Sequence, residues 1–398
     1  MRAAAPAARA VRCAVPPSRT CVNCRRQIRS FSSSTAPTPI PPRVGIAPLA
    51  SRQLLSVAGP DAAKFLQGLV TANVVEKDGL PRTDGFYAGF LTATGRVLHD
   101  LYIYPNTKQL AGVQEENAFL IEVDANHADS LARFVKRYKL RAKVTVRKVL
   151  PDEVNVWQAW DEASSSDLQL ASTSANPNIL LKDVRAPGFG YRILQSGQHK
   201  PEVDLDETTE DAYTIRRYLN GVAEGQDEIL RETALPQESN MDYMNGIDFR
   251  KGCYIGQELT IRTKHRGVVR KRILPCVIYD KSEPMPTSLQ YIPQAGGESG
   301  ASTPTADLVP RDTSIGRIGK RGRSAGKWLK GVGNIGLGLC RLEIMTDITL
   351  PGEVAAASFQ PDHEFQLEWG EDGDKSGVKV KAFVPDWLRS GLDEAAQG

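Results

Sequence analysis

The residues best suited to chemistry in this chain of 398 residues lie together in one octapeptide, Lys251-Gly252-Cys253-Tyr254-Ile255-Gly256-Gln257-Glu258. Its thiol can act as a nucleophile, a redox group or a metal ligand once it is deprotonated. Lys251 and Arg250 lie close in sequence, and nearby positive charge stabilises a thiolate. The two glycines allow positive φ or the close approach of a ligand, and Tyr254 and Ile255 supply an apolar side that can anchor the segment. The alternative is a helix-entry turn with a buried, inert cysteine.

The octapeptide resembles the K-G-C-[FY]-[ILV]-G-Q-E signature of the YgfZ-type proteins, a branch of the folate-binding GcvT (aminomethyltransferase) superfamily, and all eight positions match. The segments before it (235–242) and after it (262–272) are also similar to that family. The resemblance therefore extends from about residue 51 to about residue 274. It implies an α+β fold in which two ferredoxin-like, GcvT-type modules surround a folate-sized cleft, with a small C-terminal β-barrel.

Hydrophobic periodicity divides the chain in a way that agrees with this fold. Residues 44–150 read as the first module, with the order strand, helix, three strands, helix, strand and a hairpin around Gly95. Residues 151–261 read as the second module, with a strand from about 153, a strand pair within 184–194 and a helix from about 208 to 221. Residues 262–398 are expected to form the barrel, with strands near 315–318, 336–342, 353 and 378–383 and a disordered insertion at about 281–312.

The first 43 residues contain eight arginines and no acidic residue, which is typical of a mitochondrial transit peptide with cleavage near residue 31. Without them the chain has 42 basic and 47 acidic residues, a net charge of −5, which argues against a nucleic-acid partner. No run approaches the roughly 20 apolar residues of a membrane span. Only three cysteines remain, and they form no disulfide framework. The predicted location is the mitochondrial matrix.

A folate site is the second candidate for chemistry. The resemblance assigns binding roles to Asp100, within residues 95–101, and to Arg185, in the segment 185–192. The aminomethyltransferases carry a glutamate that faces folate in the latter segment, and this chain has none there, which makes glycine-cleavage chemistry doubtful. Glu238 also belongs to the predicted set of folate-binding residues. Arg262 and Arg266 complete the set, because the negatively charged glutamyl tail of folate requires positive charge near the mouth of the site. The basic run is equally well explained as a solvated face.

The resemblance implies a factor that assists maturation of iron–sulfur proteins, such as aconitase and radical-SAM enzymes with [4Fe-4S] clusters, and that binds tetrahydrofolate. Cys253 is expected to act as a functional thiol and as a transient ligand of a cluster shared with A-type iron–sulfur carrier proteins, since one cysteine cannot hold a cluster alone. His265 is a further candidate ligand. The alternatives are a folate-dependent one-carbon (aminomethyl) transferase and a cysteine hydrolase in which His265 or His99 activates the thiol.

Overall fold

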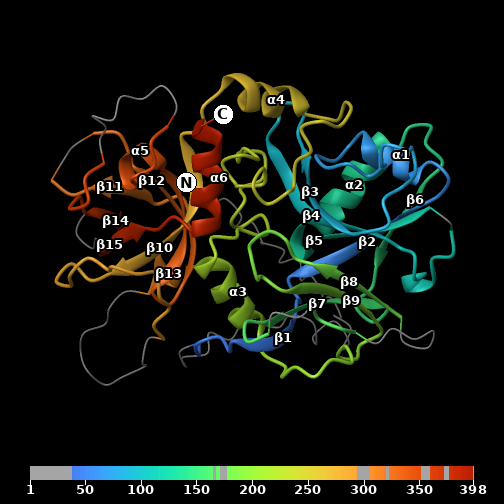
Figure 1. Cartoon of the computed structure of the whole chain (residues 1–398), viewed down its shortest axis with the longest axis horizontal. Helices are drawn as coiled ribbons and strands as arrows, with labels where there is room; N and C mark the ends of the chain where they lie inside the picture. Colours follow the sequence, from blue (N-terminus) through green and yellow to red (C-terminus); the bar gives the residue numbers. More distant parts are fainter. Residues whose placement is uncertain are drawn as a thin grey trace, which may run out of the picture. The chain divides into compact units, whose positions relative to one another are not determined.

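Three β-sheets organise the chain in its computed structural model, which describes residues 38–115, 117–164, 167–170, 177–293, 305–319, 322–350, 359–371 and 376–397. They are a five-stranded sheet, a four-stranded sheet and a closed barrel (Figure 1). The predicted class, α+β with a C-terminal barrel, is confirmed. The predicted transit peptide, residues 1–43 with cleavage near residue 31, lies outside the described residues except for 38–43 and stays a prediction.

The five-stranded sheet holds most of the predicted first module. Helices α1 (Ala62–Gln67) and α2 (Ala128–Tyr138) lie against it (Figure 1), and Leu66, Leu131 and Val135 are buried in the core that they share with the sheet. All neighbouring strands are antiparallel. The strand order in this sheet is β3-β4-β5-β2-β6. Its strands are β2 (Arg52–Ala58), β3 (Phe86–Leu91), β4 (Val97–Pro105), β5 (Ala118–Asp124) and β6 (Thr145–Val149). Two 3₁₀ turns, η2 (Leu110–Gly112) and η3 (Ala125–His127), precede and follow β5 in the chain. The predicted order of elements from residue 52 to residue 149 is confirmed.

The four-stranded sheet departs from the prediction at two places. Its order is β1-β7-β9-β8, comprising β1 (Val44–Pro48), β7 (Val154–Asp161), β8 (Asn178–Lys182) and β9 (Tyr191–Ser196). Residues 44–48, assigned to the first module, instead pair with β7 of the second sheet, because the chain enters along that sheet before it crosses to the first. The predicted strand pair within 184–194 is also wrong, since residues 183–190 form a loop between β8 and β9.

Helix α3 (Glu210–Leu219) follows this sheet and lies within the predicted range of about 208 to 221. The Thr209 hydroxyl accepts a hydrogen bond from the backbone N–H of Ala212 at 3.3 Å, which satisfies one of the free donors of the first turn. Gly221, with φ of 69°, ends the helix as predicted.

The barrel closes in the order β10-β13-β12-β11-β14-β15 and back to β10. Its start was predicted at residue 262, but helix α4 (Gln257–Arg266) continues past that point, so the first barrel strand begins at Lys271. The strands expected near 315–318, 336–342 and 378–383 are confirmed, and the one expected near 353 lies outside the described residues. The elements are β10 (Lys271–Tyr279), η4 (Ala306–Leu308), β11 (Ser314–Arg317), β12 (Gly326–Val332), β13 (Ile335–Arg341), α5 (Leu342–Met345), β14 (Phe365–Trp369), β15 (Ser376–Ala382) and α6 (Asp386–Gln397).

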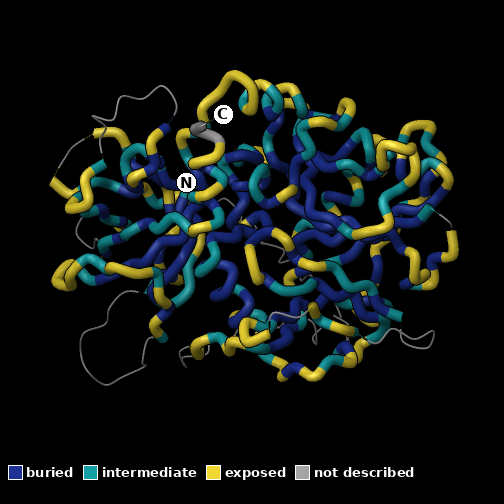
Figure 2. The backbone as a smooth tube through the Cα atoms, viewed as in Figure 1, coloured by how far each residue is buried: buried dark blue, intermediate teal, exposed yellow. Residues whose placement is uncertain are grey.

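The predicted insertion at 281–312 is only partly described. Residues 281–293 contain no regular element, yet Tyr291 is buried and its hydroxyl donates a hydrogen bond to the Thr38 carbonyl at 2.7 Å. Figure 2 shows that buried backbone runs through all three sheets. In the described part of the chain, every helix is too short or too polar to cross a lipid bilayer.

Candidate functional site

Cys253 lies on the surface, in the loop just before α4. The exposure of Cys253 is at odds with the alternative of a buried, inert cysteine, and its predicted role as a functional thiol stays a prediction. A side chain at position 252 would meet no described atom within 4 Å, and the backbone at Gly252 does not have a positive φ. The fold itself thus sets no requirement for glycine beside the thiol. Position 252 therefore has open space beside the exposed thiol.

Lys251 anchors this loop to the first module. Its ammonium donates hydrogen bonds to the carbonyl oxygens of Gln67, Val70 and Ala72 at 2.8, 2.6 and 2.9 Å. Burial lowers the pKa of Lys251 to about 7, whereas the three carbonyls favour the ammonium, because only that form can donate to all of them. All three donors of the Lys251 ammonium are thus used by backbone carbonyls, which gives Lys251 a structural role.

The rest of the octapeptide packs closely against the first module. Tyr254 is buried and Ile255 partly buried, as the predicted apolar side requires, and the Ile255 N–H donates to the Gly68 carbonyl at 3.2 Å. Gly256 has φ of 80°, and a Cβ there would lie 2.2 Å from the Thr92 carbonyl oxygen at the tip of the β3–β4 hairpin. Position 256 therefore requires glycine. Gln257 and Glu258 open α4, and the Gln257 side-chain carbonyl accepts a hydrogen bond from the backbone N–H of Tyr254 at 3.2 Å.

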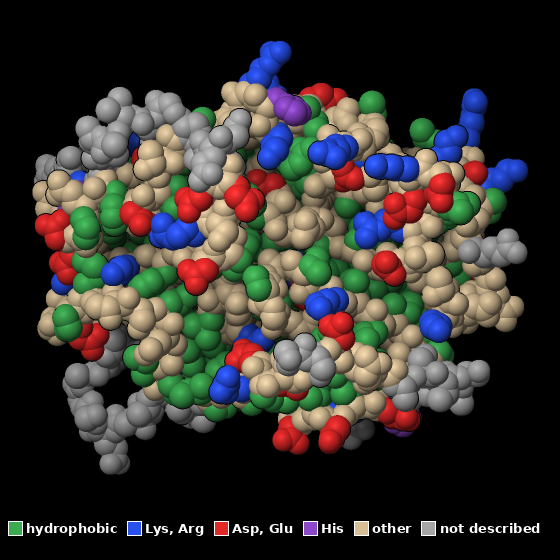
Figure 3. Space-filling model, in the orientation of Figure 1, with side chains coloured by type: hydrophobic (Ala, Val, Ile, Leu, Met, Phe, Trp, Pro, Cys, Tyr) green, Lys and Arg blue, Asp and Glu red, His purple; other side chains and the backbone are tan. Residues whose placement is uncertain are grey.

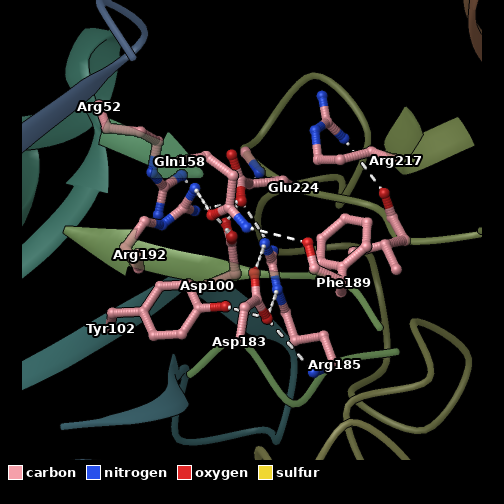
Figure 4. A network of polar contacts seen from close by, with 12 residues as sticks. Arg52, Asp100, Tyr102, Gln158, Asp183, Arg185, Phe189, Arg192, Arg217 and Glu224 are labelled. Atoms are coloured by element: carbon pink, nitrogen blue, oxygen red, sulfur yellow. Dashed lines mark hydrogen bonds and ion pairs between the residues drawn. The ribbon is translucent and has the colours of Figure 1, made fainter. Parts of the chain in front are cut away.

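A second candidate site is a buried network of charged side chains around Glu224 (Figure 4). Glu224 accepts hydrogen bonds from Arg185 at 2.7 Å, from Arg192 at 2.6 Å and from the Tyr213 hydroxyl at 2.9 Å. Burial alone would raise the pKa of Glu224, but Arg192 and Arg185 hold it well below its ordinary value. Arg185 also pairs with Asp183 at 2.8 Å. The four hydrogen bonds of the Arg185 guanidinium go to Asp183, Glu224 and Tyr213, and its predicted role in folate binding stays a prediction.

Asp100 belongs to the same network. Its Oδ1 accepts hydrogen bonds from the Gly225 N–H at 3.1 Å and the Gln226 amide at 2.9 Å. Its Oδ2 lies 3.7 Å from Arg52 Nη1 and makes no hydrogen bond with any described residue. Burial raises the pKa of Asp100, although Arg52 opposes the shift. A buried carboxyl with one oxygen unpaired can hold a proton or accept a hydrogen bond from a ligand.

Sequence reasoning missed most of this network, including Arg52, Glu122, Arg192 and Glu224. One signal was present: Glu122 interrupts an apolar strand, with buried residues on both sides. A carboxylate is rarely buried without a partner, so a cation is expected beside the Glu122 side chain. Arg52 Nε meets it at 2.8 Å and Arg192 Nη2 at 3.1 Å.

A cleft of about 660 Å³ lies between the two sheets that flank this network. Its walls come from β3 and β4 on one side and from β8 on the other. Tyr87 lines it, and the Tyr87 hydroxyl is buried and makes no hydrogen bond within the described ranges. Arg82, Lys108 and Lys182 supply positive charge at its walls. A second cleft, of about 710 Å³, lies along the β8–β9 loop, where Trp160, Tyr191 and Trp387 line it together with Arg185.

The other predicted folate residues do not join either cleft. Arg262 and Arg266 are exposed on α4, and Arg272 of the same basic run is buried and pairs with Asp242 at 2.9 Å. Glu238 pairs with Lys271 at 3.0 Å beside a separate cavity of about 160 Å³. The predicted set is thus split among three places.

Metal ligands do not cluster in the described ranges, where no group of three or more His, Cys, Asp or Glu side chains could hold an ion. His265 lies in the last turn of α4 and Cys253 before its first, so a helix about 15 Å long separates them. The idea that His265 and Cys253 share a metal is therefore wrong for one molecule. His99 is buried in β4, away from solvent. The remaining thiols, Cys276 and Cys340, are buried in the barrel with sulfurs 3.9 Å apart.

The fold of this chain resembles that of an aminomethyltransferase. Among solved structures, the crystal structure of glycine cleavage system aminomethyltransferase T from Bartonella henselae matches with a TM-score of 0.55. The match covers 86% of this chain and 86% of that chain at 10% sequence identity, which shows the fold alone. Residues 270–390 also match the family described as CAF17, C-terminal beta-barrel domain.

Sequence comparison narrows this class to one family. A protein of Pyricularia oryzae named iron-sulfur cluster assembly factor IBA57 homolog, mitochondrial, is 56% identical over 360 residues, covering 89% of this chain and 87% of the relative. Relatives with the same name from Chaetomium globosum and Neurospora crassa are 49% and 45% identical, covering 92% and 97% of this chain and 89% and 91% of their own lengths. The chain therefore belongs to the family of mitochondrial IBA57 iron–sulfur cluster assembly factors. The resemblance inferred from the octapeptide and the mitochondrial location are confirmed.

Proposed function

We propose that this protein assists the maturation of [4Fe-4S] proteins in the mitochondrial matrix, and that Cys253 supplies one ligand to a cluster shared with a partner. The observation that supports this most strongly is the exposed thiol on an anchored loop, with open space at Gly252. Lys251 and Gly256 hold the loop against the first module, so the thiol is presented at a defined position while its surroundings stay accessible.

The cluster is cargo and not a resident cofactor. A cluster site generally needs several thiolates, and the two other described thiols, Cys276 and Cys340, are buried in the barrel. The additional ligands must therefore come from another protein. A-type iron–sulfur carriers are the proposed partners, and apoproteins such as aconitase and radical-SAM enzymes are the proposed recipients.

This proposal is tested by mixing the protein with a [2Fe-2S]-loaded A-type carrier and recording the visible spectrum. We expect a shared chromophore with the wild type and none with Cys253→Ser. Cys276→Ala is the matched control, because it removes a buried thiol, and it should leave the chromophore unchanged. A chromophore of wild-type intensity with Cys253→Ser would exclude the thiol as a cluster ligand.

We further propose that tetrahydrofolate binds in the cleft between the two sheets. Its volume of about 660 Å³ is in the range of small-molecule sites, and Phe86, Tyr87 and Tyr102 provide aromatic walls for a pterin. The unpaired Tyr87 hydroxyl is a polar group that a ligand could satisfy. Arg82 and Lys108 replace Arg262 and Arg266 as candidates for the glutamyl tail, because they line this cleft.

Tyr87→Phe tests the folate site, since it removes only the hydroxyl. Titration with 5-formyltetrahydrofolate, followed by the shift in thermal unfolding, should show weaker binding than for the wild type. Tyr138→Phe on the exposed end of α2 is the control and should bind as the wild type does. Equal affinity for all three proteins would place folate elsewhere.

Folate-dependent aminomethyl transfer is the second candidate function. It is supported by Asp100, whose unpaired oxygen and raised pKa would suit a group that exchanges a proton. Turnover of tetrahydrofolate with an aminomethyl donor, abolished by Asp100→Asn, is the expected result if this function holds. Failure of the wild type to turn over any aminomethyl donor while it binds folate would rule it out.

A further inference from the structure

The outer face of α4 and the turn before the thiol carry four exposed cations, which we call the basic surface: Arg250, Arg262, Lys264 and Arg266. None of them forms an ion pair within the described ranges, and Lys264 contacts only the ring of Phe249, at 5.3 Å. Figure 3 shows Lys and Arg side chains together with a histidine along the upper edge of the molecule, over α4. These cations are therefore not used to hold the fold together.

The net charge of the segment that carries the basic surface is opposite in sign to that of residues 44–398 as a whole. Residues 248–266 contain five Lys or Arg residues and two acidic residues, a net charge of +3. Residues 44–398 as a whole carry a net charge of −5. A positive region on a negative protein attracts acidic partners.

The position of the basic surface ties it to the thiol. Helix α4 begins four residues after Cys253 and is about 15 Å long. A protein interface of standard size covers about 800 Å² on each partner, which is a disc with a radius of roughly 16 Å. An interface of this size centred on Cys253 therefore extends over α4.

We propose that the basic surface docks an acidic face of the protein that carries the cluster, next to the thiolates that hold it. This inference rests on the proposed role of Cys253. A cluster with thiolate ligands carries a net negative charge, so the same field that attracts the acidic face also favours the cluster itself. Arg262 and Arg266 then act in partner recognition, in place of the predicted contact with a folate tail.

The test uses the whole protein, a [2Fe-2S]-loaded A-type carrier as the probe and a double charge reversal, Arg262→Glu with Arg266→Glu. The control reverses Arg133 and Arg137 on α2, which are also exposed and four residues apart on a helix. Both variants change the net charge by the same amount. We expect the α4 variant to bind the carrier at least about tenfold more weakly and with a smaller dependence on salt, because docking charges set the rate and salt dependence of association. The α2 variant should stay within about twofold of the wild type.

The outcomes separate this proposal from the one on which it rests. If both variants weaken carrier binding equally, or if neither weakens it, the proposal that the basic surface docks the carrier is overturned. The Cys253 chromophore could still form with the wild type in either case. Absence of both binding and chromophore with the wild type would overturn the proposed function and this inference together. Tighter binding of the wild type to cardiolipin vesicles than to the carrier would identify a membrane surface and overturn protein docking.

Discussion

Replacement of Lys251 by methionine tests whether this residue positions the thiol loop. Methionine keeps much of the apolar stem but donates nothing to the carbonyls of Gln67, Val70 and Ala72. Three hydrogen bonds to a charged donor stabilise by about 1.5–3 kcal/mol each, or about 4.5–9 kcal/mol together. The lowering of the Lys251 pKa from 10.5 to about 7 corresponds to about 5 kcal/mol for burial of the ammonium. The difference is about −0.5 to 4 kcal/mol, and its middle predicts that the free energy of unfolding falls by about 2 kcal/mol.

The functional effect of Lys251→Met should exceed its effect on global stability. The loop at 250–256 keeps its other contacts, so we expect local loosening, seen as faster amide hydrogen exchange in that loop while α2 remains protected. Transfer of a cluster through Cys253 should slow, although the thiol itself is unchanged. Lys64→Met is the control, because Lys64 is exposed on α1 and should not affect either property.

Urea unfolding and the rate of chromophore formation with the loaded carrier measure the two effects. The reasoning is refuted if Lys251→Met unfolds at the same urea concentration as the wild type and exchanges its loop amides at the same rate. Normal loop exchange with slow cluster transfer would instead assign Lys251 a direct part in the chemistry.

Three further predictions concern the core and the octapeptide. Glu224→Gln leaves two buried arginines without their shared carboxylate and should lower the free energy of unfolding by about 3–5 kcal/mol in a urea titration; a loss below about 1 kcal/mol would contradict the network. Burial lowers the pKa of His99 from 6.5 to about 3, so below pH 6.5 the unfolded chain binds a proton that the folded chain does not. The free energy of unfolding therefore decreases as the pH is lowered, by about 2 kcal/mol between pH 6.5 and pH 5. His99→Gln should remove that dependence, and identical pH profiles for the two proteins would disprove it. Gly256→Ala should lower the free energy of unfolding by more than about 1 kcal/mol, because the new Cβ would clash with the Thr92 carbonyl oxygen and the backbone there has a positive φ. Gly252→Ala should leave the free energy of unfolding unchanged.

The predicted folate residues show how far site residues can be transferred from a family resemblance to positions in this sequence. Asp100 and Arg185 do lie near one another in the buried network, but Glu238 and the α4 arginines lie elsewhere. A sequence motif assigns residue types to a family site, and the side-chain directions depend on the elements that hold them. Helix α4 turns Arg262 and Arg266 outward, and no local pattern distinguished that helix from the expected barrel strand.

The sequence by itself determined the elements of the first module, the octapeptide and the family, because these depend on short-range periodicity and on residue types at fixed spacing. Only the tertiary structure decided that β1 joins the second sheet and that Lys251 binds backbone carbonyls 179 to 184 residues away. It also decided that Arg52, Glu122, Arg192 and Glu224, from four separate segments, meet in one buried network. Buried charges are stable only beside opposite charges, and those partners are brought together by the packing of distant segments and not by neighbours in the chain.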